Sequence, residues 1–293
     1  MQSSEECRIG GHFWRCGKYC LALGTRTLIM GVINVTPDSF SDGGRFFDLQ
    51  KAIAQGRKLI EEGADLLDIG GESSRPGSQP VSEETEKQRV LPVIEALVDC
   101  GVPLSVDTWK SGVADAACAM GASIINDITA FRGDPDMPKI AARHGCGVVL
   151  MHLRGTPATM QSLTDYADVI GEIHDFLQAS VEIAKQAGVR ADGIAVDPGI
   201  GFGKTPDQNI LILRELQQFR DLGCPLLVGT SRKSFLGHYT GQPVDERLPA
   251  TAGSVACVIA RGADIVRVHD VAAMRDVARI ADLIVRDDTD IAP

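Results

Sequence analysis

Short apolar segments alternate with longer segments of helical periodicity from residue 28 onward. A short apolar run bounded by polar or glycine positions is typical of a buried strand. Such runs predict strands at Leu28–Ile33, Asp65–Gly70, Pro103–Asp107, Ser123–Asp127, Gly147–Met151, Gly193–Asp197, Pro225–Gly229 and Asp264–Val268. Helical patterns separate them, among them Leu49–Glu62, Ser82–Cys100, Ser111–Met120 and Tyr166–Ala187. This alternation predicts an α/β fold, a (β/α)8 TIM barrel, with an open doubly wound sheet as the alternative.

The predicted units resemble one another where each helix meets the next strand. Three of these junctions share a glycine, an alanine and a polar residue: Gly63-Ala64-Asp65, Gly121-Ala122-Ser123 and Gly262-Ala263-Asp264. Glycine at this place is typical of a left-handed helix C-cap. The repetition indicates that one structural unit recurs along the chain.

The first 27 residues do not follow this pattern. The stretch HFWRCGKYCLAL, residues 12–23, places Gly17 and Lys18 between two strand-like arms and predicts a short N-terminal β-hairpin. We expect this hairpin to plug one end of the larger fold. The predicted organisation is therefore a leader and hairpin at 1–27, a barrel at 28–287 and a C-terminal tail at 288–293.

Composition narrows the range of functions. The 293 residues are 44% hydrophobic, which is enough for a full core. The net charge of −10 argues against a general nucleic-acid binder, which needs clustered Lys and Arg, although a local group of cations can still bind a small anion. No apolar run reaches the roughly 18 residues of a membrane span, and the N-terminus lacks the apolar core of a signal peptide.

Cysteine usage indicates a reducing compartment. Five of the eight cysteines are scattered through helix- or strand-like segments and are expected to be free thiols: Cys100, Cys118, Cys146, Cys224 and Cys257. Cys7, Cys16 and Cys20 gather near His12, but a C-x3-C spacing without a second pair is a weak zinc signal. We therefore expect free thiols, no zinc site and a cytoplasmic location.

Polar side chains are concentrated just after the predicted strands. They are Asn34, Glu72-Ser73-Ser74-Arg75, Asp107, Asn126-Asp127, His152, Asp197, Ser231-Arg232-Lys233, Arg267 and His269. The active site of a (β/α)8 barrel forms at the carboxyl ends of its strands. This concentration of carboxylates, amides and cations therefore favours an active site over ordinary connecting loops.

These residues fall into two groups by chemical type. Asp107, Asn126 and Asp197 suit a heterocycle with an amino-amidine edge, which a carboxylate can bind through two parallel hydrogen bonds. The second group contains cations from strands that are neighbours around a closed barrel, and it suits phosphate or pyrophosphate. Its members are Arg75, Arg267, His269 and Asn34. Asn34 also offers an oxygen to Mg²⁺, which usually keeps most of its waters and few protein ligands.

The segment DPGIGFGKT, residues 197–205, is rich in glycine but is not a P-loop, because Pro198 stands where the first glycine is required. The favoured interpretation is a glycine-shaped loop that lets Phe202 lie against a substrate, and a purely structural loop is the alternative. Among the histidines, His269 is predicted to be functional. His152 fits a core position and a site position equally well.

Seven segments of the sequence resemble the motifs of dihydropteroate synthases. In order they are NVTPDSFSDGG (34–44), DIGGESSRPG (68–77), SVDT (105–108), IINDI (124–128), DPGIGFGK (197–204), GTSRKSFLG (229–237) and RVHD (267–270). The resemblance runs from about residue 28 to residue 284. Each motif alone is weak, but seven in order at predicted strand ends are highly specific.

The resemblance implies a transferase of folate biosynthesis, typically homodimeric and a sulfonamide target. It would join 4-aminobenzoate to 6-hydroxymethyl-7,8-dihydropterin diphosphate, giving 7,8-dihydropteroate and pyrophosphate. The implied pterin ligands are Asp107, Asn126, Asp197 and Lys233. The implied Mg²⁺ ligand is Asn34, and the implied diphosphate ligands are Ser74, Arg75, Arg267 and His269. The residues implied to frame the aminobenzoate are Phe40, Pro76, Phe202 and Ser234.

The expected chemistry is an SN1-like displacement. Because the aromatic amine is already neutral, the barrier lies in breaking the C–O bond, and Asn34 with Mg²⁺, Lys233, Arg267 and His269 would be the catalytic groups. Two departures from the family pattern are Ser74 in place of Thr and the large Trp109 after SVDT. The alternatives are the pterin-binding barrel of a corrinoid-dependent methyltransferase and a non-catalytic pterin-binding module.

Overall fold

The computed structural model describes residues 12–36 and 44–286, apart from the side chains of residues 44–48. Its centre is a parallel sheet of β3 (Leu28–Asn34), β4 (Leu66–Gly70), β5 (Leu104–Asp107), β6 (Ile124–Asp127), β7 (Gly147–Met151), β8 (Ile194–Asp197), β9 (Leu227–Val228) and β10 (Ile265–Val268). The strand order is β8-β7-β6-β5-β4-β3-β10-β9. A bridge between Val196 and Leu226 joins β8 to the start of β9, which closes the sheet into a barrel. This confirms the (β/α)8 prediction and excludes the open sheet.

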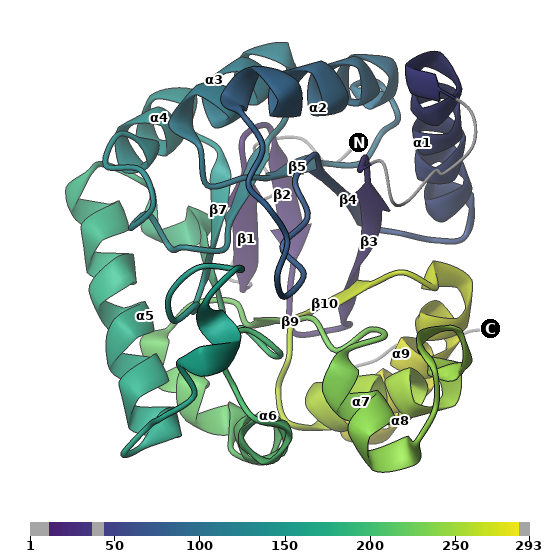
Figure 1. Ribbon diagram of the computed structural model, residues 1–293, viewed down its shortest axis with the longest axis vertical. Coiled ribbons are helices and arrows are strands. Elements are labelled where there is room, and N and C mark those ends of the chain that lie inside the picture. Colours follow the sequence, from purple (N-terminus) through teal and green to yellow (C-terminus); the bar gives the residue numbers. More distant parts are fainter. Residues whose placement is uncertain (1–11, 37–43, 287–293) are drawn as a thin grey trace.

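Helices form a ring around the barrel (Figure 1). They are α1 (Gly44–Glu61), α2 (Glu83–Leu97), α3 (Ser111–Met120), α4 (Met137–His144), α5 (Val169–Gln186), α6 (Pro206–Arg214), α7 (Ser234–Thr240), α8 (Leu248–Ala260) and α9 (Val271–Val285). Short 3-10 turns lie at Met160–Ser162, Ala191–Gly193, Leu216–Leu222 and Val244–Glu246. Most of the buried apolar side chains lie in the layer between these helices and the strands.

The barrel interior changes from apolar to polar along the strands. Its lower layer contains Met30, Leu66, Ile124, Val149, Ala195, Leu227 and Ile265, all fully or almost fully buried. Side chains in a strand alternate between its two faces, so the next inward position lies two residues further on. On four strands that position is polar: Asp68, Asn126, Asp197 and Arg267. The strand period thus places these groups together at the carboxyl end of the barrel.

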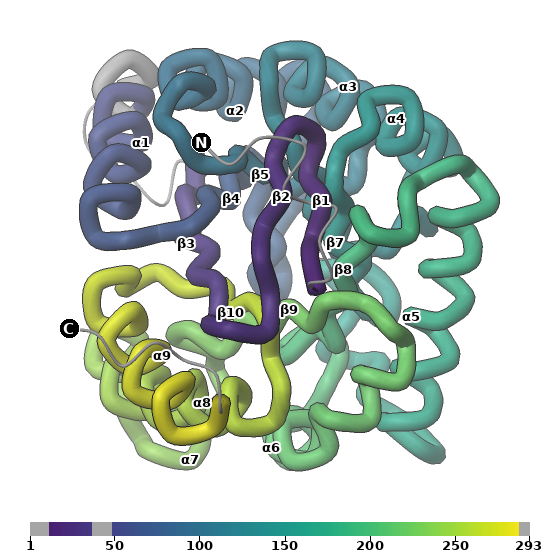
Figure 2. The backbone as a smooth tube through the Cα atoms, turned by 180° about the vertical axis from the view of Figure 1, so that it is seen from behind, coloured from purple at the N-terminus to yellow at the C-terminus, as the bar shows by residue number. Residues whose placement is uncertain are grey.

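The N-terminal hairpin plugs the opposite end of the barrel, as predicted. It consists of β1 (Phe13–Cys16) and β2 (Tyr19–Ala22), which pair antiparallel, and Figure 2 shows it lying across the barrel strands. Trp14 is fully buried against the lower interior layer, and its Nε1 donates to the Gly193 carbonyl at 3.0 Å. The hairpin therefore closes the amino end, where the barrel would otherwise expose apolar side chains.

The repeated junctions have a structural role. Gly63, Gly121 and Gly262 all have φ near +100°, the left-handed conformation that glycine adopts without strain. At two of the three junctions, the third residue is an aspartate whose side chain accepts a backbone hydrogen bond from the neighbouring strand or its start. Asp65 accepts from the Ile29 N–H at 2.8 Å, and Asp264 accepts from the Leu226 N–H at 2.9 Å.

One predicted strand and one cysteine differ from the expectations drawn from the sequence. The strand predicted at Pro225–Gly229 is only two residues long in the structure, Leu227–Val228. Pro225 has no N–H to contribute to a ladder, although its carbonyl accepts from the Val196 N–H of β8 at 2.9 Å. The five scattered cysteines are free, as predicted, and so is Cys16. The expectation of free thiols is wrong for Cys20, which is disulfide-bonded and is therefore not available as a thiolate ligand. Within residues 12–36 and 44–286, no three His, Cys, Asp or Glu side chains gather as a metal site.

Candidate active site

A cavity of about 700 Å³ opens at the carboxyl ends of the strands. Its size lies in the usual range for small-molecule sites. The predicted site residues that line it are Asn34, Ser74, Arg75, Pro76, Asp107, Phe202, Lys233, Ser234, Arg267 and His269. Asn126 and Asp197 do not line the cavity but are buried beside it, with 5% and 7% of their surface exposed. Phe40 lies outside the described residues.

Arg267 joins the carboxylates at the base of the site. Its Nε donates to Asp68 Oδ2 at 2.6 Å, and its Nη2 donates to Asp107 Oδ2 at 2.8 Å. Asp68 Oδ2 also accepts from Asn126 Nδ2 at 3.0 Å. This contact leaves the amide oxygen of Asn126 available as an acceptor. Arg267 therefore connects the two groups of residues inferred from the sequence. It belongs to the cationic group, and it bonds to Asp107 of the group that contains Asp107, Asn126 and Asp197.

Burial and repulsion control the charge of Asp107. Burial raises its pKa, the neighbouring Asp68 raises it further, and Arg267 opposes both, leaving the pKa at about 7. Burial lowers the pKa of Arg267, but Asp68 and Asp107 outweigh that effect and leave it raised. Asp68 Oδ1 is buried without a hydrogen-bond partner among the described residues. The base of the site thus contains more acceptor capacity than the protein itself uses.

A third carboxylate, Asp197, begins the glycine-rich loop. Its Oδ1 accepts from the Gly199 N–H at 2.7 Å, and burial raises its pKa to about 6 against the opposing effect of nearby lysines. The buried Lys204 holds the loop by donating to the carbonyls of Gly199 and Phe202, both at 2.9 Å. It also contacts His152 Nδ1 at 2.9 Å.

These contacts show the role of His152 and how the loop is supported. Burial lowers the pKa of His152 to about 2, so the ring is a neutral acceptor for Lys204. Its other face meets Phe176 edge-on, with ring centroids 4.7 Å apart. His152 is therefore a supporting core residue. The loop it supports presents Phe202 to the cavity; the contact of Phe202 with a substrate stays a prediction.

Lys233 and Arg232 point in different directions, although they are adjacent in sequence. The Lys233 ammonium lies 4.1 Å from the Phe202 ring centroid, and burial lowers its pKa to about 8. Arg232 has φ +58° and makes a bidentate ion pair with Asp270, at 3.0 and 2.6 Å. Both residues line the cavity, but the Arg232 guanidinium is bound by Asp270, whereas the Lys233 ammonium lies against the Phe202 ring.

The remaining predicted residues lie around the cavity rim. His269 Nδ1 is 3.0 Å from Ser231 Oγ, and burial lowers the pKa of His269 to about 4. Asn34 ends β3, between β4 and β10, as the predicted order of strands requires. Ser74, Arg75 and Pro76 come from the loop after β4 and Ser234 from the first turn of α7; Arg75, Pro76 and Ser234 are exposed.

Two supporting residues, Asp68 and Lys204, were not among the sequence candidates, and the contact of Ser231 with His269 was not predicted. Asp68 carries a readable signal, since it lies two residues after the inward Leu66. The contacts of Ser231 with His269 and of Lys204 with His152 have no such signal, because each joins loops that are far apart in the sequence. No helix within the described ranges is long and apolar enough to cross a membrane.

Comparison with known proteins identifies the family. A family model described as "Pterin binding enzyme" matches residues 30–269. The dihydropteroate synthase of Synechocystis sp. is 48% identical over 265 residues, covering 90% of this chain and 92% of that protein. A solved dihydropteroate synthase of Xanthomonas albilineans with 4-aminobenzoic acid is 42% identical, with a TM-score of 0.88 over 94% of this chain and 98% of that one.

A second solved structure, the dihydropteroate synthase of Burkholderia cenocepacia complexed with 7,8-dihydropteroate, is 41% identical. Its TM-score is 0.84, over 94% of this chain and 96% of that one. The fold, the polar residues at the strand ends and the extent of these matches agree with one another. The chain belongs to the pterin-binding enzyme family and, within it, to the dihydropteroate synthases.

Proposed function

We propose that this enzyme joins 4-aminobenzoate to 6-hydroxymethyl-7,8-dihydropterin diphosphate by a dissociative displacement, releasing pyrophosphate. The observation that carries the proposal is the meeting of Asp107, Lys233 and Arg267 at one cavity, with Asn126 and Asp197 buried beside it. A pterin presents both donors and acceptors along its edges, and this set contains partners for both.

In this proposal the carboxylates and the amide accept hydrogen bonds from the pterin. Asp197 and Asp107 accept from the amino-amidine edge, and Asn126 accepts through the oxygen that Asp68 leaves free. Lys233 donates to the carbonyl and ring-nitrogen acceptors. Its position against Phe202 supports this role, because it holds the ammonium at the cavity wall.

The diphosphate is assigned to the cationic side of the cavity. Two of the five N–H donors of Arg267 are used by Asp68 and Asp107, and the other three have no partner among the described residues. Arg267 can therefore hold the carboxylates and a phosphate oxygen at the same time. Arg75, Ser74 and His269 supply further donors at the rim.

The donor set at Asn34 fits Mg²⁺, which takes oxygen ligands and is usually held by few protein groups together with substrate phosphates. Asn34 brings one amide oxygen to the cavity wall close to the cationic group. Bound there, Mg²⁺ would neutralise charge on the leaving pyrophosphate. No second protein ligand is needed for this assignment.

The aminobenzoate is assigned to the outer part of the cavity, where Pro76, Phe202 and Ser234 lie. Phe202 offers a ring face, and the Ser234 hydroxyl offers a donor to the carboxylate. Phe40 belongs to the same assignment on the family resemblance alone. The dihydropteroate synthase of Yersinia pestis was solved as a sulfonamide drug complex, and we infer that sulfonamides compete for this subsite here.

The protein's charges favour departure of the diphosphate before the amine bonds. Arg267 and His269 stabilise charge on the leaving group, while Asp107 and Asp197 place negative charge near the electron-rich pterin that carries the cation. These groups are fixed by the hydrogen bonds described above, so little reorganisation is needed during the reaction.

Product analysis tests the function. The purified enzyme with both substrates and Mg²⁺ should form 7,8-dihydropteroate and pyrophosphate in equal amounts, and neither product when 4-aminobenzoate or the pterin substrate is omitted. Pyrophosphate release at the full rate without 4-aminobenzoate would show a hydrolase instead. For the mechanism, the bridging oxygen of the diphosphate is labelled with ¹⁸O. Label that never moves to a non-bridging position in recovered substrate, with or without a slowly reacting amine analogue, would contradict a dissociative step.

We also propose a cytoplasmic homodimer. Helix α9 exposes Ile280 and Ile284, which are 59% and 76% accessible, and the adjacent Val285 is 42% accessible. Residues four apart in a helix share a face, so Ile280 and Ile284 form one apolar strip. A second copy of this chain would cover it, in line with the typical homodimer of the family.

A further inference from the structure

The loop between β4 and α2, residues 71–82, carries three of the proposed substrate contacts and is held at only a few points. Arg75, Pro76 and Gly77 are exposed, so burial does not fix the middle of the loop. One hydrogen bond ties its tip to another loop, from the Gly77 N–H to the Pro157 carbonyl at 3.1 Å, and within the tip Ser78 donates to the carbonyls of Arg75 and Ser73. Its base, by contrast, enters a dense polar network centred on Glu72.

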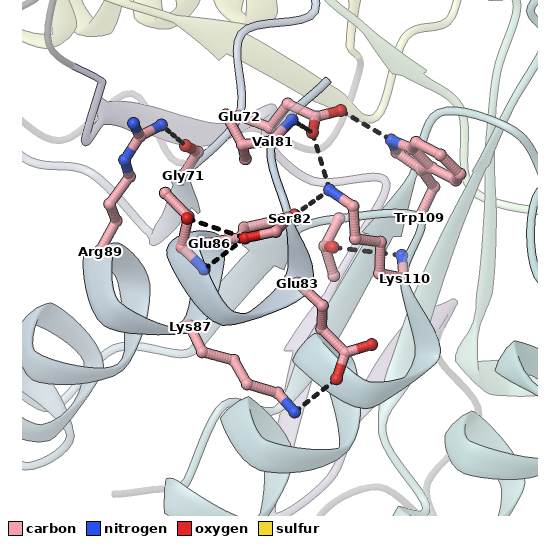
Figure 3. Close-up of polar contacts among 12 residues, drawn as sticks. Gly71, Glu72, Val81, Ser82, Glu83, Glu86, Lys87, Arg89, Trp109 and Lys110 are labelled. Carbon is pink, nitrogen blue, oxygen red and sulfur yellow. Dashed lines mark hydrogen bonds and ion pairs between the residues drawn. The ribbon is translucent and has the colours of Figure 1, made fainter.

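Glu72 binds both of the residues that follow Thr108 in the next loop. Its Oε1 accepts from Trp109 Nε1 at 3.0 Å, and its Oε2 accepts from Lys110 Nζ at 2.7 Å. The same Oε2 accepts from the Val81 N–H at 2.8 Å, which ties the two ends of loop 71–82 together. Figure 3 shows Trp109 and Lys110 converging on Glu72 from the loop after β5.

Lys110 extends the network to helix α2. Its ammonium also pairs with Glu86, whose side chain is 1% accessible, while the side chains of Lys110 and Glu72 are 13% and 11% accessible. Burial lowers the pKa of Lys110, but its hydrogen bonds to both carboxylates outweigh this and leave it raised. The lysine is therefore charged and fixed between two elements, and it aligns Glu72 with α2.

Trp109 connects this network to the cavity wall. Its ring packs against the apolar cluster of Ile128, Met151, Leu153, Met160 and Phe202. Two of these residues, Met160 and Phe202, line the cavity. The indole thus packs against the cavity wall that contains Phe202 and, through its N–H, holds the loop that carries Ser74, Arg75 and Pro76.

We propose that Trp109 is a positioning residue that fixes loop 71–82, and with it Ser74, Arg75 and Pro76, in the binding conformation before substrate arrives. The inference rests on the proposed substrate contacts of those three residues. Fixing the loop in advance removes an ordering cost from substrate binding. Loss of the indole N–H should therefore weaken substrate binding and leave the rate of reaction within the enzyme–substrate complex unchanged.

The test compares two matched substitutions. The chain has two tryptophans, and each donates one indole hydrogen bond of 3.0 Å, Trp109 to Glu72 and Trp14 to Gly193 at the other end of the barrel. Trp109→Phe and Trp14→Phe each remove one such bond and keep an aromatic ring. Hydrogen exchange of the 73–78 amides, measured without substrate, reports the order of the loop. It does so whether or not the proposed reaction occurs.

We expect Trp109→Phe to speed exchange of these amides and to raise KM for 4-aminobenzoate about three- to tenfold, the effect of one lost hydrogen bond, with kcat within about twofold of the parent. Trp14→Phe should change neither quantity. Glu72→Gln, which keeps the side-chain shape but weakens the bonds to Trp109 and Lys110, should reproduce the Trp109→Phe result. Exchange and KM in Trp109→Phe and Glu72→Gln equal to those of Trp14→Phe would overturn the proposal.

Discussion

Asp107 is a carboxylate at a position where burial and a second carboxylate both oppose its ionisation. Its pKa of about 7 means that it is only partly ionised near neutral pH, even with Arg267 beside it. A pterin that donates to Asp107 would favour the ionised form and lower that pKa. The ionised Asp107 carboxylate is therefore more favourable with the pterin bound than in the free protein, which is common for binding residues.

This gives a prediction about stability and pH. The pKa of Asp107 in the folded protein lies above its ordinary value of 3.8, so folding favours the protonated form. The favourable contribution is complete below pH of about 4 and is lost as the pH rises through about 7. Asp107→Asn should therefore raise the free energy of unfolding at pH 8 by about 2 kcal/mol and have little effect at pH 4.

Urea unfolding of the parent and Asp107→Asn at the two pH values measures this difference. We take about half of the shift's full value, because the substitution also removes one of the two ion pairs of Arg267. The variant should bind the pterin substrate poorly. A variant that is less stable than the parent at pH 8 would show that the Arg267 pair, and not desolvation, dominates at Asp107.

At the scale of elements, we expect the N-terminal hairpin to contribute to stability and not to catalysis. Trp14 is fully buried at the amino end of the barrel, whereas the cavity opens at the carboxyl ends of the strands, and Trp14 does not line it. Trp14→Ala leaves a large cavity in the lower interior layer. We expect it to lower the free energy of unfolding by about 3–5 kcal/mol, as for other buried aromatic side chains.

The same variant should keep both KM values close to those of the parent at a temperature where it is folded. Urea unfolding and steady-state kinetics on one preparation measure the two effects together. A change in KM much larger than twofold, with stability unaffected, would mean that the hairpin acts on the active site and is not a structural plug.

The elements were largely predictable because their signals are local. Apolar runs found all eight barrel strands to within one or two residues, and the helix Ser111–Met120 was found with its observed bounds. Short elements were harder, as β9 shows, since closure of the barrel there depends on one bridge to β8.

The site was predictable as a set of residues and less so as a set of contacts. Strand period places Asn126, Asp197 and Arg267 on the interior, but it does not say which way a long guanidinium turns. Arg267 turns toward Asp68 and Asp107, because two buried carboxylates would otherwise lack a counter-charge. Contacts of this kind depend on distances across the barrel, which a linear pattern does not contain.

At the scale of the whole molecule, the exposed strip on α9 predicts how copies associate. Replacing Ile280 and Ile284 together by Lys would place two charges in the proposed interface, where like charges from the second copy would face them. We expect the parent to sediment as a dimer and the double variant as a monomer that remains folded. Sedimentation velocity measures both.

The matched control replaces Leu163 and Leu211, which are 41% and 40% accessible but lie away from α9, by Lys. It should leave the dimer intact. A parent that sediments as a monomer at micromolar concentration, or a double variant of α9 that remains dimeric, would contradict the assignment of this face.

The central claim is that the inward polar residues at the carboxyl end of the barrel recognise a pterin, and Asp197 tests it most directly. Asp197→Asn replaces a carboxylate that accepts two hydrogen bonds by an amide that presents donors to donors. The loss of charge-assisted contacts should cost on the order of 2–4 kcal/mol. Calorimetric titration of 6-hydroxymethyl-7,8-dihydropterin diphosphate should therefore give a Kd roughly 30- to 1000-fold above that of the parent. A variant that binds this substrate as tightly as the parent would show that the pocket has been assigned to the wrong ligand.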